Sequence, residues 1–241
     1  MSLLRAEGIA KSFRGLKAVA QASFDVPQGG IVALIGPNGA GKTTCFNMIA
    51  GVFAPDSGRI IFEDREIHGR RADQVCAAGI GRTFQIVKPF AGLSVLDNVL
   101  VGALLRERGA ASARALALAV LKKLKLDDKK DAPASALTLP DRKRLEVARA
   151  LATRPRLLLL DEVMAGLRPT ECDEMVGVFR DLNRTDGLTI LLIEHVMRAV
   201  MALAQHVGVL HHGELIARGT PQAVVKDPAV LECYLGEEAE V

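Results

Sequence analysis

Residues 36–44, GPNGAGKTT, combine three glycines with a lysine and two threonines. The stretch matches the pattern GxxxxGK(S/T) and lies between an apolar run, IVALI, and a helical pattern, TTCFNMIAG. The glycines let the backbone curl so that consecutive N–H groups point at phosphate oxygens, and the start of the following helix adds its positive end. We therefore predict a nucleotide-phosphate site, rather than a plain glycine-rich turn, with Lys42 at the β- and γ-phosphates and Thr43 as a ligand of Mg²⁺. The residues of this site are Gly36, Pro37, Asn38, Gly39, Ala40, Gly41, Lys42, Thr43 and Thr44.

The apolar run RLLLLDE ends in two carboxylates, Asp161 and Glu162. A strand that ends there delivers both charges at its carboxyl edge, where Asp161 can hold Mg²⁺ and Glu162 can polarise an attacking water. Taken alone, an acidic pair after a strand is more often a helix cap than a catalyst. Together with the phosphate loop at 36–44, the pair favours nucleotide hydrolysis.

Two further polar residues, Gln85 in GRTFQ and His195 in LLIEH, each follow a strand-like run. Considered alone, each is well explained as a solvated glutamine or as a histidine whose hydrogen bonds are met within the structure. Their order relative to the phosphate loop and the acidic pair makes them candidate site residues.

Short apolar runs rich in Val, Ile and Leu recur along the chain, with helical patterns between several of them. The runs are GGIVALIG, RIIF, RLLLLDE and LTILLIEH, and their alternation with helices predicts a mainly parallel sheet in an α/β fold. Antiparallel pairs are predicted for LLRAEGIAKSF with VAQASFDV, and for VGVLHHGELIARG, which turns at His212-Gly213.

Residues 88–139 break this alternation. The stretches SVLDNVLVGALLRE and ARALALAVLKKLKL are helical by period and propensity, and no strand-like run lies between them. We expect a helical insertion there, in a core formed by residues 1–87 and 140–241.

The bulk composition excludes several classes of protein. The formal net charge of +3 over 241 residues is too small to indicate a nucleic-acid surface. The four scattered cysteines indicate neither a disulfide framework nor a zinc site, and they fit a reducing cytoplasm. The longest apolar runs fall far short of a membrane span, so we expect any membrane crossing to be done by other chains.

Taken in order, these motifs resemble the nucleotide-binding subunit of an ATP-binding cassette (ABC) transporter, over essentially the whole chain. The resemblance implies a P-loop NTPase (RecA-like) core with an antiparallel β subdomain and a helical insertion, which is the ABC ATPase architecture. It also implies a Mg²⁺-dependent ATPase.

The same resemblance assigns roles to individual residues. Gln85 would contact Mg²⁺ and the attacking water, and His195 would contact the γ-phosphate. Phe13 matches the aromatic residue that stacks on adenine, with membership of the core as the alternative. The dimer-contact loop would be Ala165, Gly166 and Leu167, and the Mg²⁺ ligands would be Thr43, Gln85 and Asp161.

A closer resemblance is to one of the two ATPase subunits of branched-chain amino acid importers, through KSFRGLKAV, GRTFQ, RKRLEVARAL, DEVMAGLRPTE, LLIEHVM and VLECYLGEE. Two positions depart from the usual pattern of that group. Val163 stands where proline commonly follows the glutamate, and Val196 stands where aspartate commonly follows the histidine. Neither departure removes a group that does chemistry. The resemblance implies a subunit that binds and hydrolyses ATP and powers uptake of branched-chain or related amino acids through separate membrane subunits.

The partners that this resemblance implies are a second ABC ATPase subunit, two transmembrane permease subunits and a periplasmic or extracellular solute-binding protein, with no nucleic acid. The chain would lie at the cytoplasmic face of the inner membrane, where residues 88–139 would dock on the permease. Four alternatives stay open: the homodimeric ABC ATPase of lipopolysaccharide transport, an importer of a different small organic solute, a soluble cassette ATPase of DNA repair or translation, and a non-hydrolysing ATP-binding switch.

In this family two ATPase subunits close head to tail, and each ATP lies between one subunit's phosphate loop and the other's signature segment, usually LSGGQ. Here the signature segment is Leu137, Thr138, Leu139, Pro140 and Asp141. Pro140 has no N–H, Leu139 adds bulk, and Asp141 would bring negative charge toward a phosphate.

The signature segment also has the features of a helix cap. Thr138 and Asp141 have the spacing of a capping box, and Pro140 suits a first helical turn. The hypothesis is that this helix satisfies its own N-terminus and offers the partner's ATP a poor anion site, so that the partner is a different chain. The alternative is that the Thr138 hydroxyl and the remaining N–H groups still form a working signature. The next three residues, Arg142, Lys143 and Arg144, are expected on the solvated face of the helix.

Overall fold

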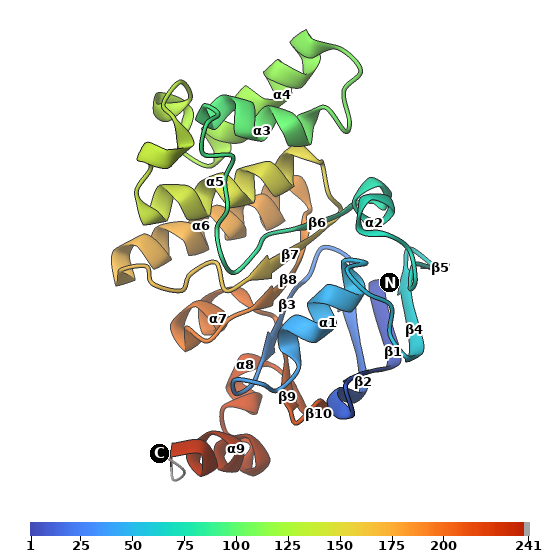
Figure 1. Cartoon of the computed structure of the whole chain (residues 1–241). Coiled ribbons are helices and arrows are strands. Elements are labelled where there is room, and N and C mark those ends of the chain that lie inside the picture. The colour runs from blue at the N-terminus through green and yellow to red at the C-terminus, as the bar shows by residue number, and fades with distance from the viewer. Residues whose placement is uncertain (239–241) are drawn as a thin grey trace. The chain divides into compact units, whose positions relative to one another are not determined.

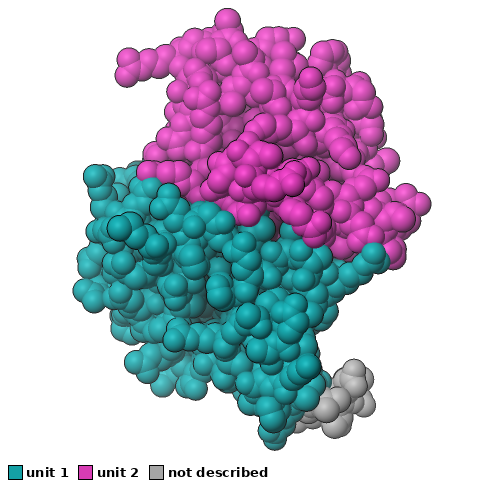
Figure 2. Space-filling model, turned by 180° about the vertical axis from the view of Figure 1, so that it is seen from behind, with its two compact units in different colours: residues 1–75, 189–241 teal, residues 76–188 magenta. Residues whose placement is uncertain are grey.

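The computed structural model describes residues 1–238 and divides into two compact units. The first unit contains residues 1–75 and 189–241, and the second contains residues 76–188 (Figure 2). Helix α2 (Ala72–Ala78) carries the chain from the first unit into the second. Among the described residues, no helix is long and apolar enough to span a lipid bilayer.

The first unit contains an antiparallel sheet with the strand order β2-β1-β4-β5 (Figure 1). Its strands are β1 (Ser2–Phe13), β2 (Leu16–Pro27), β4 (Ser57–Phe62) and β5 (Arg65–Glu66). The antiparallel pairing of β1 with β2 confirms the sequence prediction. The interpretation of RIIF as part of the parallel sheet is wrong, because β4 pairs antiparallel with β1. Only the last three residues of β4 are buried, whereas parallel strands are usually covered on both faces.

Parallel strands also occur in the first unit. Strand β3 (Ile31–Ile35) lies between β8 (Thr189–Ile193) and β9 (His206–His211) and runs parallel to both. All five residues of β3 and all five of β8 are buried, as expected for strands covered on both faces. Strand β9 turns at His212-Gly213 into the antiparallel β10 (Glu214–Gly219), which confirms the predicted hairpin. The helices of this unit include α1 (Lys42–Ile49), α7 (Met197–Leu203), α8 (Pro221–Val224) and α9 (Pro228–Glu238).

The second unit is mainly helical around two parallel strands, β6 (Ile80–Arg82) and β7 (Leu157–Asp161). Its helices are α3 (Val95–Ala103), α4 (Ala110–Lys123), α5 (Leu139–Ala152) and α6 (Pro169–Asp186), with short 3-10 turns η1 (Asp127–Lys129) and η2 (Ala134–Ala136). Helices α3 and α4 pack against α5 (Figure 1). The stretch 88–139 therefore consists of α3, α4 and the two 3-10 turns with their connections, and its boundaries as an insertion stay a prediction.

The phosphate loop begins where β3 ends, and its first glycine has no space for a side chain. Gly36 has a φ of 143°, and a Cβ at this position would stand 2.0 Å from the backbone oxygen of Leu210 in β9. Gly39 at the tip of the loop also has a positive φ, 80°, but a Cβ there would meet nothing within 4 Å. Strand β9 therefore fixes the start of the loop, while the tip stays open.

These two glycines give a matched pair of substitutions. We expect Gly36→Ala to lower the free energy of unfolding by about 2 to 4 kcal/mol, because it adds a backbone clash to the cost of a positive φ. Gly39→Ala should cost only about 1 kcal/mol, since it carries the conformational cost alone. Chemical denaturation without nucleotide measures both values, and equal small losses would contradict the close approach of Gly36 to β9.

Candidate functional site

The phosphate loop encloses its own lysine. The side chain of Lys42 is buried, and its Nζ donates to the backbone oxygens of Gly36 at 2.6 Å and Pro37 at 2.7 Å. Gly36, Gly39 and Gly41 all have positive φ values, which lets the loop curl around the ammonium. The loop thus holds a positive charge near its centre before any anion binds.

The N-terminus of α1 is open to an anion. The helix begins at Lys42 after Gly41, no side chain caps it, and its first turn contains no acidic residue. Helix α3 differs, because its N-cap Ser94 accepts a hydrogen bond from the backbone N–H of Asp97. The first N–H groups of a helix carry a partial positive charge, so the uncapped start of α1 fits phosphate oxygens. The exposed Thr43 in this turn offers a hydroxyl, a ligand type suited to Mg²⁺.

Phe13, at the end of β1, is 43% exposed, so the alternative that placed it in the core is wrong. Its ring packs edge-on against Phe53, with centroids 5.3 Å apart, and the Nζ of Lys11 lies 5.8 Å from its centroid. An exposed ring held in this way can stack on a flat aromatic base. Phe53 carries no signal in the sequence that would link it to Phe13, because no local pattern connects residues 40 positions apart.

Two other residues of the first unit flank these motifs. His195 is the second residue after β8 and is exposed, whereas Glu194, which directly follows the strand, is buried. Cys45 lies in α1 just after the phosphate loop, and burial raises the pKa of its thiol to about 12. This thiol is therefore protonated at neutral pH and is a poor nucleophile.

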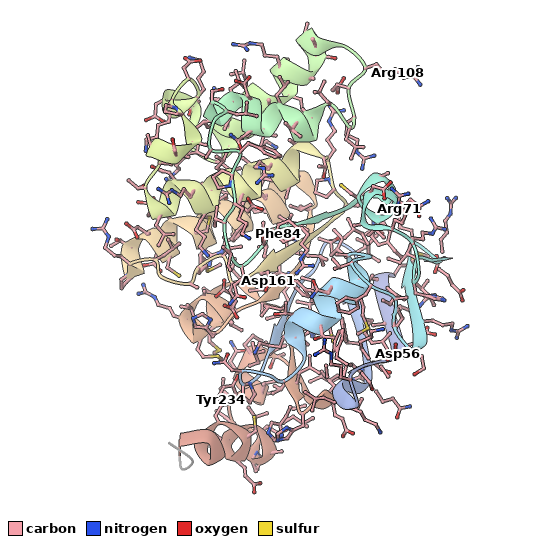
Figure 3. The ribbon with its side chains drawn as sticks, in the orientation of Figure 1. Asp56, Arg71, Phe84, Arg108, Asp161 and Tyr234 are labelled. Carbon is pink, nitrogen blue, oxygen red and sulfur yellow. The ribbon has the colours of Figure 1, made fainter. Side chains whose placement is uncertain are left out.

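In the second unit, Asp161 ends β7 with its carboxylate buried and paired. Its Oδ2 accepts a hydrogen bond from Nη2 of Arg82 at 3.1 Å, and its backbone N–H donates to Oγ1 of Thr83 at 3.1 Å. The Arg82 guanidinium also lies 5.2 Å from the ring centroid of Phe84, which is labelled with Asp161 in Figure 3. Arg82 belongs to the GRTFQ stretch, but nothing in the local sequence pattern points to its pairing with Asp161. A carboxylate oxygen is a ligand type that Mg²⁺ prefers, so this position fits the ion.

The structure brings Gln85 and Glu162 together. Nε2 of Gln85 donates to Oε2 of Glu162 at 2.7 Å. The backbone of Glu162 has a φ of 49°, and its oxygen accepts hydrogen bonds from the N–H of Ala165 at 3.2 Å and from Nζ of Lys143 at 3.0 Å. Gln85 thus holds the carboxylate of Glu162, and Lys143 and Ala165 hold its backbone oxygen. A partly exposed carboxylate held in this way can accept a proton from a water molecule.

The capping box expected at the signature segment is wrong. Thr138 is the N-cap of α5, but its hydroxyl donates to Oδ2 of Asp141 at 2.9 Å, and its side chain makes no cap bond. The Asp141 carboxylate is buried and turned into the protein, where Nζ of Lys129 lies 2.6 Å from Oδ2 and Nη1 of Arg144 lies 3.7 Å from Oδ1. A buried carboxylate needs cationic partners, and these override the local cap. Asp141 therefore does not present its charge to a facing phosphate. The expectation that this helix satisfies its own N-terminus through Thr138 is also wrong, because the Thr138 side chain makes no cap bond.

The side chain of Leu139 points toward the predicted dimer-contact loop at residues 165–167. Leu139 is 46% exposed, and its Cδ2 stands 3.4 Å from the place where a Cβ of Gly166 would be. Gly166 itself has a φ of 76° and is exposed. The residue that replaces the first signature glycine thus lies beside the space that a side chain at Gly166 would occupy.

The solvated face expected for residues 142–144 is wrong for two of the three residues. Lys143 is 5% exposed, and the Arg144 side chain is 12% exposed and paired with Glu174 and Asp141. Only Arg142 is exposed, and its Nε donates to the backbone oxygen of Leu137 at 2.8 Å. Helix α5 is covered on most of its surface, so its charged residues need partners inside the unit.

Glu146 is a further charged residue of α5 that lies inside the second unit. Burial raises the pKa of its carboxyl group, against the opposing charges of Arg149 and Lys143 and a hydrogen bond from the backbone of Phe84. Nη1 of Arg149 donates to its Oε2 at 2.8 Å. The carboxylate of Glu146 is therefore one more buried charge that depends on cations of the same helix.

Comparison with known proteins agrees with this geometry. A family model described as ABC transporter matches residues 19–165, and a second, described as branched-chain amino acid ATP-binding cassette transporter, matches residues 214–240. The chain is 37% identical over 250 residues to the high-affinity branched-chain amino acid transport ATP-binding protein LivG of Escherichia coli (strain K12), with 98% of each chain covered. It is 35% identical, at the same coverage, to the corresponding protein BraF of Pseudomonas aeruginosa.

Solved structures show the same likeness. A nucleotide-free ATP-binding cassette from an ABC transporter has a TM-score of 0.89 at 32% identity and covers 97% of this chain and 99% of its own. The ADP conformation of MJ1267, an ATP-binding cassette of an ABC transporter, has the same TM-score and identity and covers 98% of this chain. Because the first family model matches more than half of the sequence, and relatives above 30% identity span nearly all of it, the chain belongs to the ABC transporter family and has the fold of its ATP-binding cassettes.

Proposed function

We propose that this chain is the ATP-hydrolysing subunit of an importer that takes up branched-chain or related amino acids through separate membrane subunits. The observation that carries the hydrolytic part is the hydrogen bond from Gln85 to Glu162 beside the end of β7. The names of the relatives LivG and BraF and the family match at residues 214–240 support the amino acid part. That match favours amino acid importers over the homodimeric ATPase of lipopolysaccharide transport.

The roles proposed for the first unit concern the nucleotide. Lys42 and the N–H groups of residues 36–44 bind the phosphates, because the loop already holds a cation and the start of α1 is uncapped. Phe13 stacks on adenine, and its exposed ring and the neighbouring Phe53 support this role. His195 contacts the γ-phosphate from its exposed position after β8.

The roles proposed for the metal rest on the chemistry of the donor set. Thr43 of the first unit would offer a hydroxyl oxygen, and Gln85 and Asp161 of the second unit would offer amide and carboxylate oxygens, all of them hard ligand types that Mg²⁺ prefers. When bound, Mg²⁺ neutralises charge that develops on the β- and γ-phosphates. Arg82 keeps the Asp161 carboxylate in place with its hydrogen bond, and Glu162 takes the proton of the attacking water.

Glu162→Gln tests the hydrolytic role. We expect the turnover number for ATP to fall by about 100-fold or more, because an amide cannot accept the proton. Binding of a fluorescent ATP analogue should be unchanged, since the phosphate loop is intact. Turnover is measured for the purified chain alone and mixed with the cassette subunit encoded beside it. A variant with normal turnover would contradict the proposed function.

The proposed partners are a second ABC ATPase subunit, two transmembrane permease subunits and a periplasmic or extracellular solute-binding protein, with this chain on the cytoplasmic face of the membrane. A different ATPase partner is supported by the signature segment. The Thr138 hydroxyl donates to Asp141, Pro140 has no N–H, and Leu139 adds an exposed apolar side chain. These features weaken the anion site that this chain offers to a facing ATP, so its own ATP needs the intact signature of another chain.

Restoring glycine at the signature tests the asymmetric dimer. We expect Leu139→Gly with Pro140→Gly to raise the ATP turnover of the chain assayed alone by about tenfold, the effect of one regained hydrogen bond to a charged phosphate. Asp141 is left in place, because its buried pairs with Lys129 and Arg144 stabilise α5. Changing Asp141 to Gln as well should add little beyond a loss of stability. High turnover of the unmodified chain alone would contradict the asymmetric dimer and would favour a homodimeric ATPase instead.

Docking on the permease is proposed for the segment 88–139, with Gln85 at its root. Exposed large apolar side chains occur on this segment at Phe90, Leu93, Val101, Leu104 and Leu105, and just before it at Phe84 and Ile86. Apolar side chains exposed in such number on one segment indicate a protein interface.

We expect Val101→Lys with Leu104→Lys to abolish copurification with the permease and amino acid uptake, while binding of the ATP analogue is unchanged. A matched control is Leu231→Lys in α9, which replaces another exposed leucine and should leave copurification intact. Uptake by cells that carry the Val101 and Leu104 variant measures coupling, and normal uptake would refute this docking surface.

A further inference from the structure

Three charged residues form a row along one face of α5. Lys143, Glu146 and Arg149 are spaced three residues apart, which places them on neighbouring turns of the same side of the helix. Lys143 is 5% exposed and Glu146 is 4% exposed. Charged side chains are almost never buried to this extent unless they are paired, so this row has a structural or functional reason.

One end of the row holds the backbone of Glu162. Nζ of Lys143 donates to the backbone oxygen of Glu162 at 3.0 Å, and the same oxygen accepts the N–H of Ala165 at 3.2 Å. Glu162 has a φ of 49°, which costs a residue with a side chain about 1 kcal/mol or more. Such a conformation persists only when the surroundings fix it, and Lys143 supplies a contact from a separate helix.

The other end of the row holds the segment that follows Gln85. Nη1 of Arg149 donates to Oε2 of Glu146 at 2.8 Å and to the backbone oxygen of Lys88 at 3.1 Å. The Arg149 guanidinium also lies 4.8 Å from the ring centroid of Phe90. The row therefore spans from the turn that carries Glu162 to the segment just after the glutamine that binds the Glu162 carboxylate.

We propose that Lys143 is a positioning residue for Glu162, and that the Glu146 carboxylate, which Arg149 holds, supplies the opposite charge for its ammonium on the same face of the helix. Gln85 fixes the carboxylate end of Glu162 by its side chain, and Lys143 fixes the backbone end. The two contacts together set the direction in which the carboxylate points. This inference rests on the proposed function, because aiming the carboxylate matters only if Glu162 accepts the proton of the attacking water.

A role confined to stability would give a different result from a positioning role. If Lys143 acts through Glu162, replacing Lys143 should lower the rate of ATP hydrolysis only when the Glu162 carboxylate is present. If Lys143 merely stabilises the second unit, its loss should lower activity by the same factor whether residue 162 is glutamate or glutamine. A double-mutant cycle separates the two, because residues that act as a unit are strongly non-additive.

The test uses the full chain, purified with the subunits that copurify with it. We expect Lys143→Met to lower the turnover number for ATP by about 10- to 100-fold, the usual effect of a misplaced catalytic group, with KM for ATP changed less than about twofold. Lys143→Arg should lie between Lys143→Met and the unmodified chain, since it keeps the charge but moves the donor. Lys226→Met, at an exposed position after α8, is the matched control and should behave as the unmodified chain.

The deciding measurement is single-turnover hydrolysis in the Glu162→Gln background. There we expect Lys143→Met to change the rate by less than about twofold. An equal fold loss in both backgrounds, or normal turnover of Lys143→Met, overturns the positioning role. If Lys143→Met does not fold, the same cycle is run with Lys143→Arg, which retains the buried charge. Normal turnover of Glu162→Gln alone would instead refute the proposed function.

Discussion

The buried charge around the end of β7 is the constraint on which the second unit depends. Asp161 at the end of β7 and Asp141, Lys143 and Glu146 in α5 are all buried, and each must be matched inside the protein because an unpaired buried charge costs roughly several kcal/mol. Their partners come from β6, η1, α5 and the turn after β7. The pairings therefore bind together the segments that carry Gln85, the signature and Glu162.

Such pairs specify an arrangement more than they stabilise it. Replacing a buried ion pair by apolar residues is often neutral, whereas removing one partner is strongly destabilising. Helix α5 uses this property on two sides. On one side of the helix, Asp141 points inward, so the signature segment does not present its negative charge to a facing phosphate. On another side, Lys143 reaches the backbone of Glu162. A single helix thus contains both the departure from the usual signature and a support for the proposed catalytic carboxylate.

What could be predicted from the sequence was local. The loop at 36–44 follows from spacing within nine residues, and the fully buried β3 and β8 follow from unbroken apolar runs. The errors arose where a distant partner decides the outcome. The capping box failed because Lys129, twelve residues from Asp141, pairs with it, and RIIF was misassigned because three apolar residues fit either kind of sheet. Arg82 and Asp161 are 79 positions apart, a separation that no periodicity reports.

The departure at Val163 has a physical link with the conformation of Glu162. A proline at position 163, common in the related subunits, would push the residue before it toward an extended backbone with negative φ. Valine removes that restriction, and here Glu162 has a φ of 49°. A conformation that local sterics do not impose must be imposed by contacts, and these include the hydrogen bonds of Lys143 and Ala165 to the Glu162 oxygen. In the positioning role proposed for Lys143, helix α5 supplies part of the support that this backbone conformation needs, and the turn at Ala165 supplies another part.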